Sequence, residues 1–172
     1  MPGKGIYCAL IVAGCALLGR LLSRKYRNRT RRLQQLSDRF AHMGSLFAYD
    51  APVLDELMDR VAGNDELTPF LRAFQEALRA PENGVRDAWQ NAVTRQESGA
   101  LAALTTDDRQ LIRGFGELLE QVDRLGLRGH CQLIRERLEG QLIQAQAEQL
   151  KYEKLYGTLG ILGGCLIVVL LL

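Results

Sequence analysis

Apolar residues are concentrated at the two ends of the 172-residue chain. Residues 6–22 are apolar apart from Arg20, and residues 155–172 carry no charge. An 18-residue helix is about 27 Å long, close to the roughly 30 Å hydrocarbon core of a bilayer. The two ends therefore predict transmembrane helices over 5–23 and 155–172, which enclose a central domain over 24–154.

The central segment repeats its apolar residues at helical spacing. No stretch of useful length alternates with period two, so strands are not expected. The connections are short, and we expect an all-α fold in which an antiparallel helical bundle is flanked by the two spans. The clearest stripe steps by three and four residues and extends the first span to about Tyr49; it consists of Leu33, Leu36, Phe40, Met43 and Phe47.

Capping residues, prolines and glycines predict where the helices of the central segment begin and end. A short helix over 53–62 is expected to turn Val53 inward. Thr68-Pro69 predicts an N-cap followed by proline at the first helical position. Thr105-Thr106, followed by two aspartates, predicts another helix start with hydroxyl caps, and the cap is expected at Thr106. The last helix is expected to begin near His130, after the glycines at 126 and 129, and to continue into the second span without a break.

Basic residues follow the first apolar run directly. Residues 20–32 contain seven basic and no acidic residues, whereas 33–150 contain 12 basic and 19 acidic residues. Basic flanks of membrane helices stay on the cytoplasmic side, so the central domain is expected in the cytosol and both termini across the membrane. A cleaved signal peptide would instead carry its basic residues before the apolar run. The expected membrane-flanking residues are Arg20, Arg24, Lys25, Arg27, Arg29, Arg31, Arg32, Lys151 and Lys154.

Several short motifs occur in a fixed order along the chain. They are Tyr49-x-x-Pro52, Ala88-Trp89, Phe115-Gly116-Glu117 with Asp123, and the segment 151–160 leading into the last span. Over essentially the whole chain this order resembles the stage III sporulation protein AB family of endospore-forming bacteria. This chain departs from the family pattern at two places. It has Glu120 where the family usually has glycine, and its residues 125–129 lack the glutamine that the family usually has there.

The resemblance implies a role in a complex that connects mother cell and forespore. It implies a place in the mother-cell membrane around the forespore, with a cytosolic domain similar to the platform protein of type II secretion and type IV pilus systems. The implied partners are a separate hexameric secretion-type ATPase and the other membrane subunits of the channel. On this interpretation the chain is a non-catalytic scaffold. The alternatives are a membrane-anchored helical regulator or receptor, and a membrane enzyme that uses dispersed carboxylates.

The sequence offers little for catalysis or for cofactors. It has no phosphate-binding loop, dinucleotide fingerprint, zinc-protease motif or serine-hydrolase elbow. Its cysteines lack metal-ligand spacing and are interpreted as reduced structural thiols. The chain is therefore not expected to be an enzyme, and no cofactor, metal, nucleic acid or small-molecule substrate is expected.

Three further features are candidates for packing or binding. Trp89 lies on an apolar stripe and is expected in the core rather than on a partner-binding surface. Gly157, Gly160 and Gly164 would allow close packing in the last span, against the first span, a second copy or another membrane protein. An acidic group could dock a basic partner, although a solvated helix face is the simpler interpretation; it consists of Asp55, Glu56, Asp59, Asp65 and Glu66.

Overall fold

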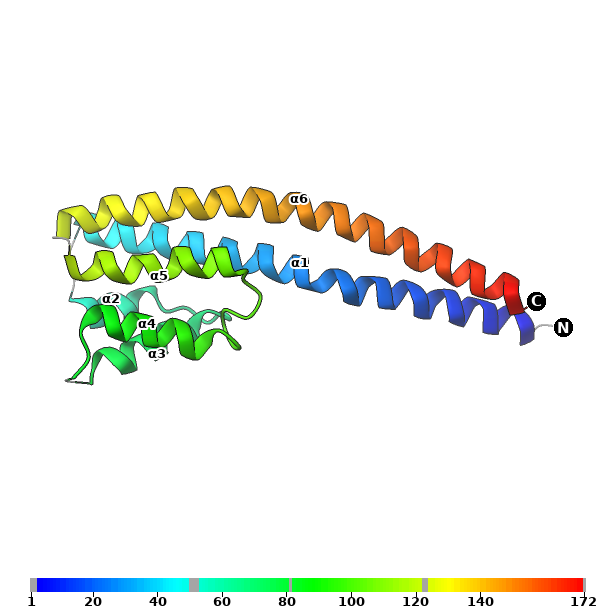
Figure 1. Cartoon of the computed structure of the whole chain (residues 1–172), viewed down its shortest axis with the longest axis horizontal. Coiled ribbons are helices and arrows are strands. Elements are labelled where there is room, and N and C mark those ends of the chain that lie inside the picture. Colours follow the sequence, from blue (N-terminus) through cyan, green and yellow to red (C-terminus); the bar gives the residue numbers. More distant parts are fainter. Residues whose placement is uncertain (1–2, 50–52, 81, 122–123, 172) are drawn as a thin grey trace. The chain divides into compact units, whose positions relative to one another are not determined.

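A computed structural model describes residues 3–49, 53–80, 82–121 and 124–171. All regular structure within these ranges is helical, as predicted (Figure 1). The helices are α1 (Gly3–Tyr49), α2 (Leu54–Val61), α3 (Thr68–Leu78), α4 (Val85–Gln96), α5 (Thr106–Gln121) and α6 (Arg124–Leu171).

The chain forms two compact units. The helix-pair unit contains Met1–Thr30 and Gln144–Leu172, and the bundle unit is Arg31–Ile143. Helices α1 and α6 each contribute residues to both units, whereas α2 to α5 belong to the bundle unit alone. The predicted limits of the central domain, 24 and 154, refer to a membrane boundary and stay predictions.

The bundle unit has an aromatic core centred on Trp89. Its indole ring is fully buried and lies edge-on to Phe70, Phe74 and Phe115, with ring centroids 4.9 to 5.3 Å apart. Phe115 also meets Phe40 of α1 at 4.8 Å. Edge-to-face rings add favourable energy beyond the burial of their area. The prediction that Trp89 lies in the core is confirmed.

The predicted stripe of α1 is also buried, but Val53 is not. All five residues of the stripe are at most 8% exposed, which confirms the amphipathic helix to Tyr49. Val53 is 69% exposed, so its predicted inward position is wrong. It precedes α2 in extended backbone at the N-cap position, where the helical stripe does not yet apply.

Two predicted caps differ from the observed ones. Thr105, rather than Thr106, caps α5: its hydroxyl accepts the backbone N–H of Asp108, and the Asp108 carboxylate accepts the backbone N–H of Thr105. This reciprocal arrangement corresponds to a capping box. Thr68 is the first residue of α3, and Leu67 is its N-cap. The Thr68 hydroxyl donates instead to the carbonyl of Gly63 at 2.6 Å and so fixes the loop before the helix.

The last helix begins earlier than predicted. α6 includes the glycines at 126 and 129, and its 48 residues reach Leu171. The imidazole of His130 contacts the carbonyl oxygen of Gly126 at 2.8 Å, one turn earlier in the same helix. Isolated glycines cost a helix only about 1 kcal/mol each, which tertiary packing readily offsets. The prediction of one unbroken helix into the last apolar segment is confirmed.

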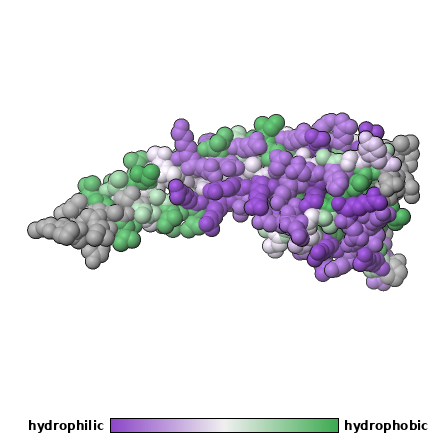
Figure 2. Space-filling view, turned by 180° about the vertical axis from the view of Figure 1, so that it is seen from behind, coloured by the Kyte–Doolittle hydropathy of each residue, from purple (hydrophilic) through white to green (hydrophobic). Residues whose placement is uncertain are grey.

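Apolar side chains are exposed on the helix-pair unit. In Figure 2, hydrophobic residues gather on α1 and α6 where these helices belong to this unit. Within the described residues, one helix, Gly126–Val169, is long and apolar enough to cross a membrane. Most side chains of the predicted first span before residue 13 lie outside the described part, and that span remains a prediction. The exposed residues include Leu17, Leu18, Leu21, Leu22, Leu155, Leu159, Leu162 and Leu166.

Candidate functional site

Two glycines bring α1 and α6 into backbone contact within the helix-pair unit. A Cβ atom added to Gly160 would lie 2.7 Å from the carbonyl oxygen of Cys15 and 3.3 Å from Cα of Ala16. A Cβ on Gly19 would collide with the carbonyl group of Tyr156. Each helix therefore supplies one glycine to the crossing. Small residues permit this close approach of membrane helices.

The three glycines predicted to pack in the last span are used differently. Gly160 meets α1, and Gly164 is buried. A Cβ on Gly157 would have no heavy atom within 4 Å. Gly157 thus borders open space beside the crossing rather than a packed contact. The contribution of Gly19 on the opposite helix was not foreseen, because α1 contains no GxxxG spacing at this point.

Aromatic rings and ion pairs continue the contact between α1 and α6. Tyr26 stacks on Tyr152 with ring centroids 4.2 Å apart and 11° between the planes. Arg27 pairs with Glu153 at 3.2 Å, and Arg29 pairs with Glu148 at 2.9 Å. Residue numbers fall on one helix as they rise on the other, so the two helices are antiparallel.

The basic residues predicted to flank the membrane surround this polar part of the helix pair. Lys25 lies 4.9 Å from the centroid of the Tyr26 ring, and Lys151 lies 5.8 Å from that of Tyr152. Arg20, Arg24, Arg31 and Lys154 are exposed. Arg32 belongs to the bundle unit, where it pairs with Glu66 at 3.0 Å. We call the basic residues at 20–27 together with 151 and 154 the collar.

A cavity of about 450 Å³ opens between the two helices at the collar. Arg20 and Arg27 are its two basic lining residues, and Glu153 is its acidic one. The hydroxyl of Ser23 is directed to the carbonyl of Arg20 at 2.9 Å, so this buried side chain is satisfied within its own helix. We call this cavity the collar groove; it is lined by Gly19, Arg20, Ser23, Arg27, Glu153 and Gly157.

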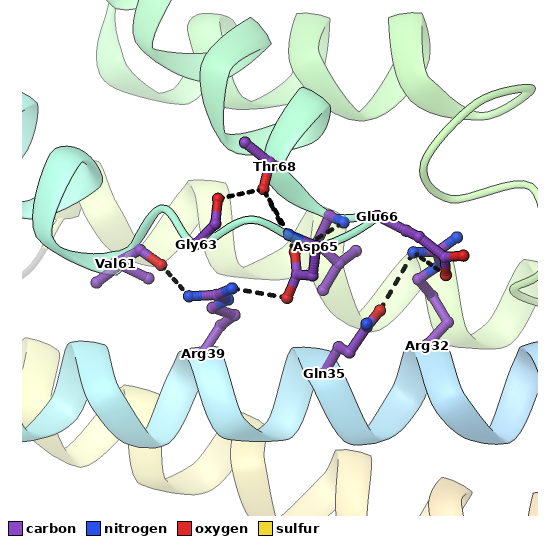
Figure 3. A network of polar contacts seen from close by, with 9 residues as sticks. Arg32, Gln35, Arg39, Val61, Gly63, Asp65, Glu66 and Thr68 are labelled. Atoms are coloured by element: carbon purple, nitrogen blue, oxygen red, sulfur yellow. Dashed lines mark hydrogen bonds and ion pairs between the residues drawn. The ribbon is translucent and has the colours of Figure 1, made fainter.

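Two residues of the acidic group, Asp65 and Glu66, contact arginines of α1 in the bundle unit (Figure 3). The guanidinium group of Arg39 donates to the Asp65 carboxylate at 2.6 Å and to the backbone carbonyl of Val61. Burial alone would raise the pKa of Asp65, but the hydrogen bonds from Arg39 and the backbone N–H of Leu67 outweigh burial and lower that pKa. Arg39 thus holds the segment between α2 and α3 against α1.

The other acidic residues of this group also have partners. Asp55 pairs with Arg79 at 3.2 Å, Glu56 with Arg60 at 2.6 Å, and Glu66 with Arg32 at 3.0 Å. Asp59 accepts a hydrogen bond from the amide of Gln75 at 2.8 Å. The structure therefore brings the five residues close to basic or amide groups of their own unit. This arrangement favours a structural use of their charges over a bare acidic surface.

A second cavity, of about 600 Å³, lies between α1 and α6 in the bundle unit. Small residues of α1 form one wall, namely Ala41, Gly44, Ser45 and Ala48. Polar residues of α6 form the other wall, and Tyr49, which is 93% exposed, borders the cavity. We call it the bundle groove. This groove was not predicted from the sequence, although the spacing of its small residues by three and four was a readable signal.

The cysteines fit the interpretation as structural thiols where the structure describes them. Cys131 is fully buried, and this burial raises its pKa to about 12. A thiol with that pKa is protonated at neutral pH and is a poor nucleophile and metal ligand. Cys15 and Cys165 are free thiols of the helix-pair unit.

Comparisons with known proteins agree on one sequence family. The family described as Stage III sporulation protein AB matches residues 4–172. The Stage III sporulation protein AB of Bacillus subtilis (strain 168) is 24% identical over 171 residues, which cover 98% of this chain and 99% of that protein. A solved structure of Stage III sporulation protein AB (SpoIIIAB) superposes with a TM-score of 0.62 at 20% identity, and covers 72% of this chain and 98% of its own.

Proposed function

The chain belongs to the stage III sporulation protein AB family, and from this premise we propose that it is a non-catalytic platform subunit of a membrane complex in sporulation. Family membership supports the sporulation role and contact with other sporulation proteins. The finer assignment is that the subunit docks a cytosolic secretion-type ATPase in the mother cell. We further propose that it crosses the mother-cell membrane twice, with the bundle unit in the cytosol.

One observation carries this proposal: the glycine-packed, antiparallel pair of α1 and α6 exposes apolar side chains and bears a collar of basic residues. Exposed leucines on a closely packed pair suit lipid, whereas in water they would cost free energy. The collar suits the cytoplasmic edge of a membrane. Because α1 and α6 are uninterrupted helices of 47 and 48 residues, a load applied to the bundle unit would reach the membrane segments without a flexible linker.

The bundle groove is the surface that we favour for the ATPase. Four of the five carboxylates of the predicted partner patch are paired with arginines of their own unit, and Asp59 accepts a hydrogen bond from Gln75, which weakens the attraction of the group for an external basic surface. The bundle groove instead combines a wall of small residues with the exposed ring of Tyr49. Exposed tyrosines beside a concavity are frequent anchors in protein interfaces.

The direct test is binding of a purified secretion-type ATPase from the same sporulation system to the full-length chain in lipid nanodiscs. We expect saturable association, which Tyr49→Ala weakens by about tenfold, as for a single interface anchor. Val53→Ala is the matched control, since it removes another exposed apolar side chain outside the groove. Absence of association at low salt would refute the docking role, and equal losses for both variants would refute the groove as its site.

A further inference from the structure

We propose that the collar groove is a binding site for the phosphate headgroup of an anionic phospholipid. The proposal rests on membrane insertion of the helix pair, which is part of the proposed function. It concerns a specific site between α1 and α6, beyond the general attraction of a basic segment to a membrane surface.

The space in the groove depends on glycine at position 157. The crossing of α1 and α6 closes at Gly160, where an added Cβ would meet backbone atoms of α1. At Gly157, nearly one turn earlier in α6, an added Cβ would meet nothing within 4 Å. The helices are thus in contact on one side of the groove and leave a cavity of about 450 Å³ next to it.

The chemistry of the lining suits a phosphate group. Arg20 and Arg27 contribute two positive charges against the single negative charge of Glu153. Arg27 approaches Glu153 through Nε, and a guanidinium group carries four further N–H donors on its terminal nitrogens. Arginine binds phosphate oxygens through such donors in a planar fork. The groove therefore offers directed donors together with a net positive charge.

The surroundings distinguish a lipid from a free phosphate ion. On the side of the groove towards the apolar end of the helix pair, α1 and α6 carry exposed leucines, including Leu17, Leu21 and Leu159. Towards the other end lie the stacked rings of Tyr26 and Tyr152. Tyrosine rings and basic residues are enriched where headgroups meet water, and basic pockets between membrane helices bind anionic headgroups. A ligand with both a phosphate and acyl chains matches both neighbourhoods.

The experiment uses the full-length chain in detergent micelles and measures bound lipid by native mass spectrometry. The probes are dioleoyl phosphatidylglycerol, dioleoyl phosphatidylcholine and inorganic phosphate, added separately. We expect about fivefold higher occupancy with phosphatidylglycerol than with phosphatidylcholine, since one basic contact at a membrane surface is worth about that factor. Inorganic phosphate should not displace phosphatidylglycerol. Displacement by inorganic phosphate would overturn the lipid assignment in favour of an anion site.

Two variants test the groove itself. The double variant R20Q/R27Q removes its positive charges, and Gly157→Leu fills its open space without a change of charge. Both should reduce phosphatidylglycerol occupancy to the phosphatidylcholine level. The matched control R24Q/K25Q removes two collar charges that do not line the groove and should keep the preference. Equal loss in the control, or full binding by Gly157→Leu, would refute the site.

Membrane insertion is measured separately, so that the two proposals can fail separately. Carbonate extraction of membranes from cells that express each variant reports whether the helix pair is integrated. Integrated protein without a lipid preference refutes the site alone. Protein that carbonate releases from the membrane refutes the anchoring on which the site depends, and with it the site.

Discussion

Gly116 lies directly against the indole ring of Trp89. A Cβ atom added at position 116 would approach Cδ1 of the ring to 2.6 Å, closer than any ordinary van der Waals contact. The indole N–H on the same ring donates to the carbonyl oxygen of Ile112 at 2.7 Å, which fixes the ring in place. The Ala88-Trp89 and Phe115-Gly116 motifs, 27 residues apart in the sequence, are therefore the two sides of one contact.

Gly116→Ala should destabilise the bundle unit by about 1–3 kcal/mol, the usual cost of overpacking a core. Gly114→Ala is the matched control in the same helix, because a Cβ there would meet nothing within 4 Å. The control should stabilise the protein by up to about 1 kcal/mol through helix propensity. Urea unfolding of the full-length protein in micelles measures both changes, and the same sign for both variants would contradict the contact.

Trp89→Ala should destabilise the protein by about 3–5 kcal/mol, since it empties the centre of the aromatic core. Trp89→Phe should cost less, because a ring still meets Phe70 and Phe74, but it leaves the carbonyl of Ile112 without its indole donor. A loss below about 1 kcal/mol for Trp89→Ala would be incompatible with a buried core position. Chemical denaturation monitored by circular dichroism gives both values.

Gly160→Ala should separate α1 and α6 locally, since its methyl group would collide with the backbone at Cys15. The expected result is a lower thermal midpoint of the full-length protein in micelles. Gly163→Ala is its control, because a Cβ at position 163 has no heavy atom within 4 Å. If the two midpoints are equal, the close crossing of α1 and α6 does not exist in the membrane-mimetic environment.

Asp65 should make stability depend on pH in the acid range. The pKa of Asp65 is lowered in the folded protein, so the ionised carboxylate adds to the free energy of unfolding. This stabilisation is complete above the ordinary aspartate pKa of about 3.9 and is lost as pH falls through the pKa of the folded state. Asp65→Asn should therefore destabilise the protein at neutral pH, and the difference from wild type should shrink below about pH 4. Unfolding curves between pH 2.5 and 7 check this, with Glu82→Gln as a charge control in the exposed turn between α3 and α4. A difference that persists at pH 2.5 would show that the ionised carboxylate is not what stabilises the loop.

The predicted topology is open to chemical labelling. Glu82 is exposed in the turn between α3 and α4, so Glu82→Cys provides an accessible thiol. We expect no reaction with a membrane-impermeant maleimide in intact cells and full reaction after permeabilisation, because the bundle unit should be cytosolic. The unsubstituted protein measures the background from its own cysteines. Labelling of Glu82→Cys in intact cells would reverse the proposed orientation.

Helical periodicity predicted the core better than the helix ends. The apolar stripe from Leu33 to Phe47 continues over several helical turns, so the helix is most stable when this face is buried. The cap of α5 was displaced by one residue, because Thr105 and Thr106 are chemically equivalent in sequence. The predicted start of α6 is too late, because Gly126 and Gly129 do not end the helix: packing of Leu127 and Cys131 keeps this turn helical.

The contacts between distant segments could not be obtained from one sequence. Gly160 was visible as a packing residue, but nothing in the sequence pairs it with Cys15 or shows that Gly19 faces Tyr156. The carboxylates at 55–66 were visible as a charged group, while the arginines that pair with four of them come from α1, from α2 and from Arg79, the residue directly after α3. Such pairings depend on the rotation of each helix about its axis, which tertiary packing decides.

The antiparallel helix pair restricts how this family can gain or lose residues. Cys15 lies opposite Gly160 and Gly19 opposite Tyr156, so the two residue numbers at each level have the same sum. Deleting one residue between Gly19 and Tyr26 would rotate the part of α1 before the deletion by about 100° and shift it by about 1.5 Å relative to α6. Both close contacts would then be lost at once. Insertions and deletions in these stretches should therefore be tolerated in evolution only in two cases. Either both helices change length together, or the number of residues gained or lost returns the glycines to the same face of the helix.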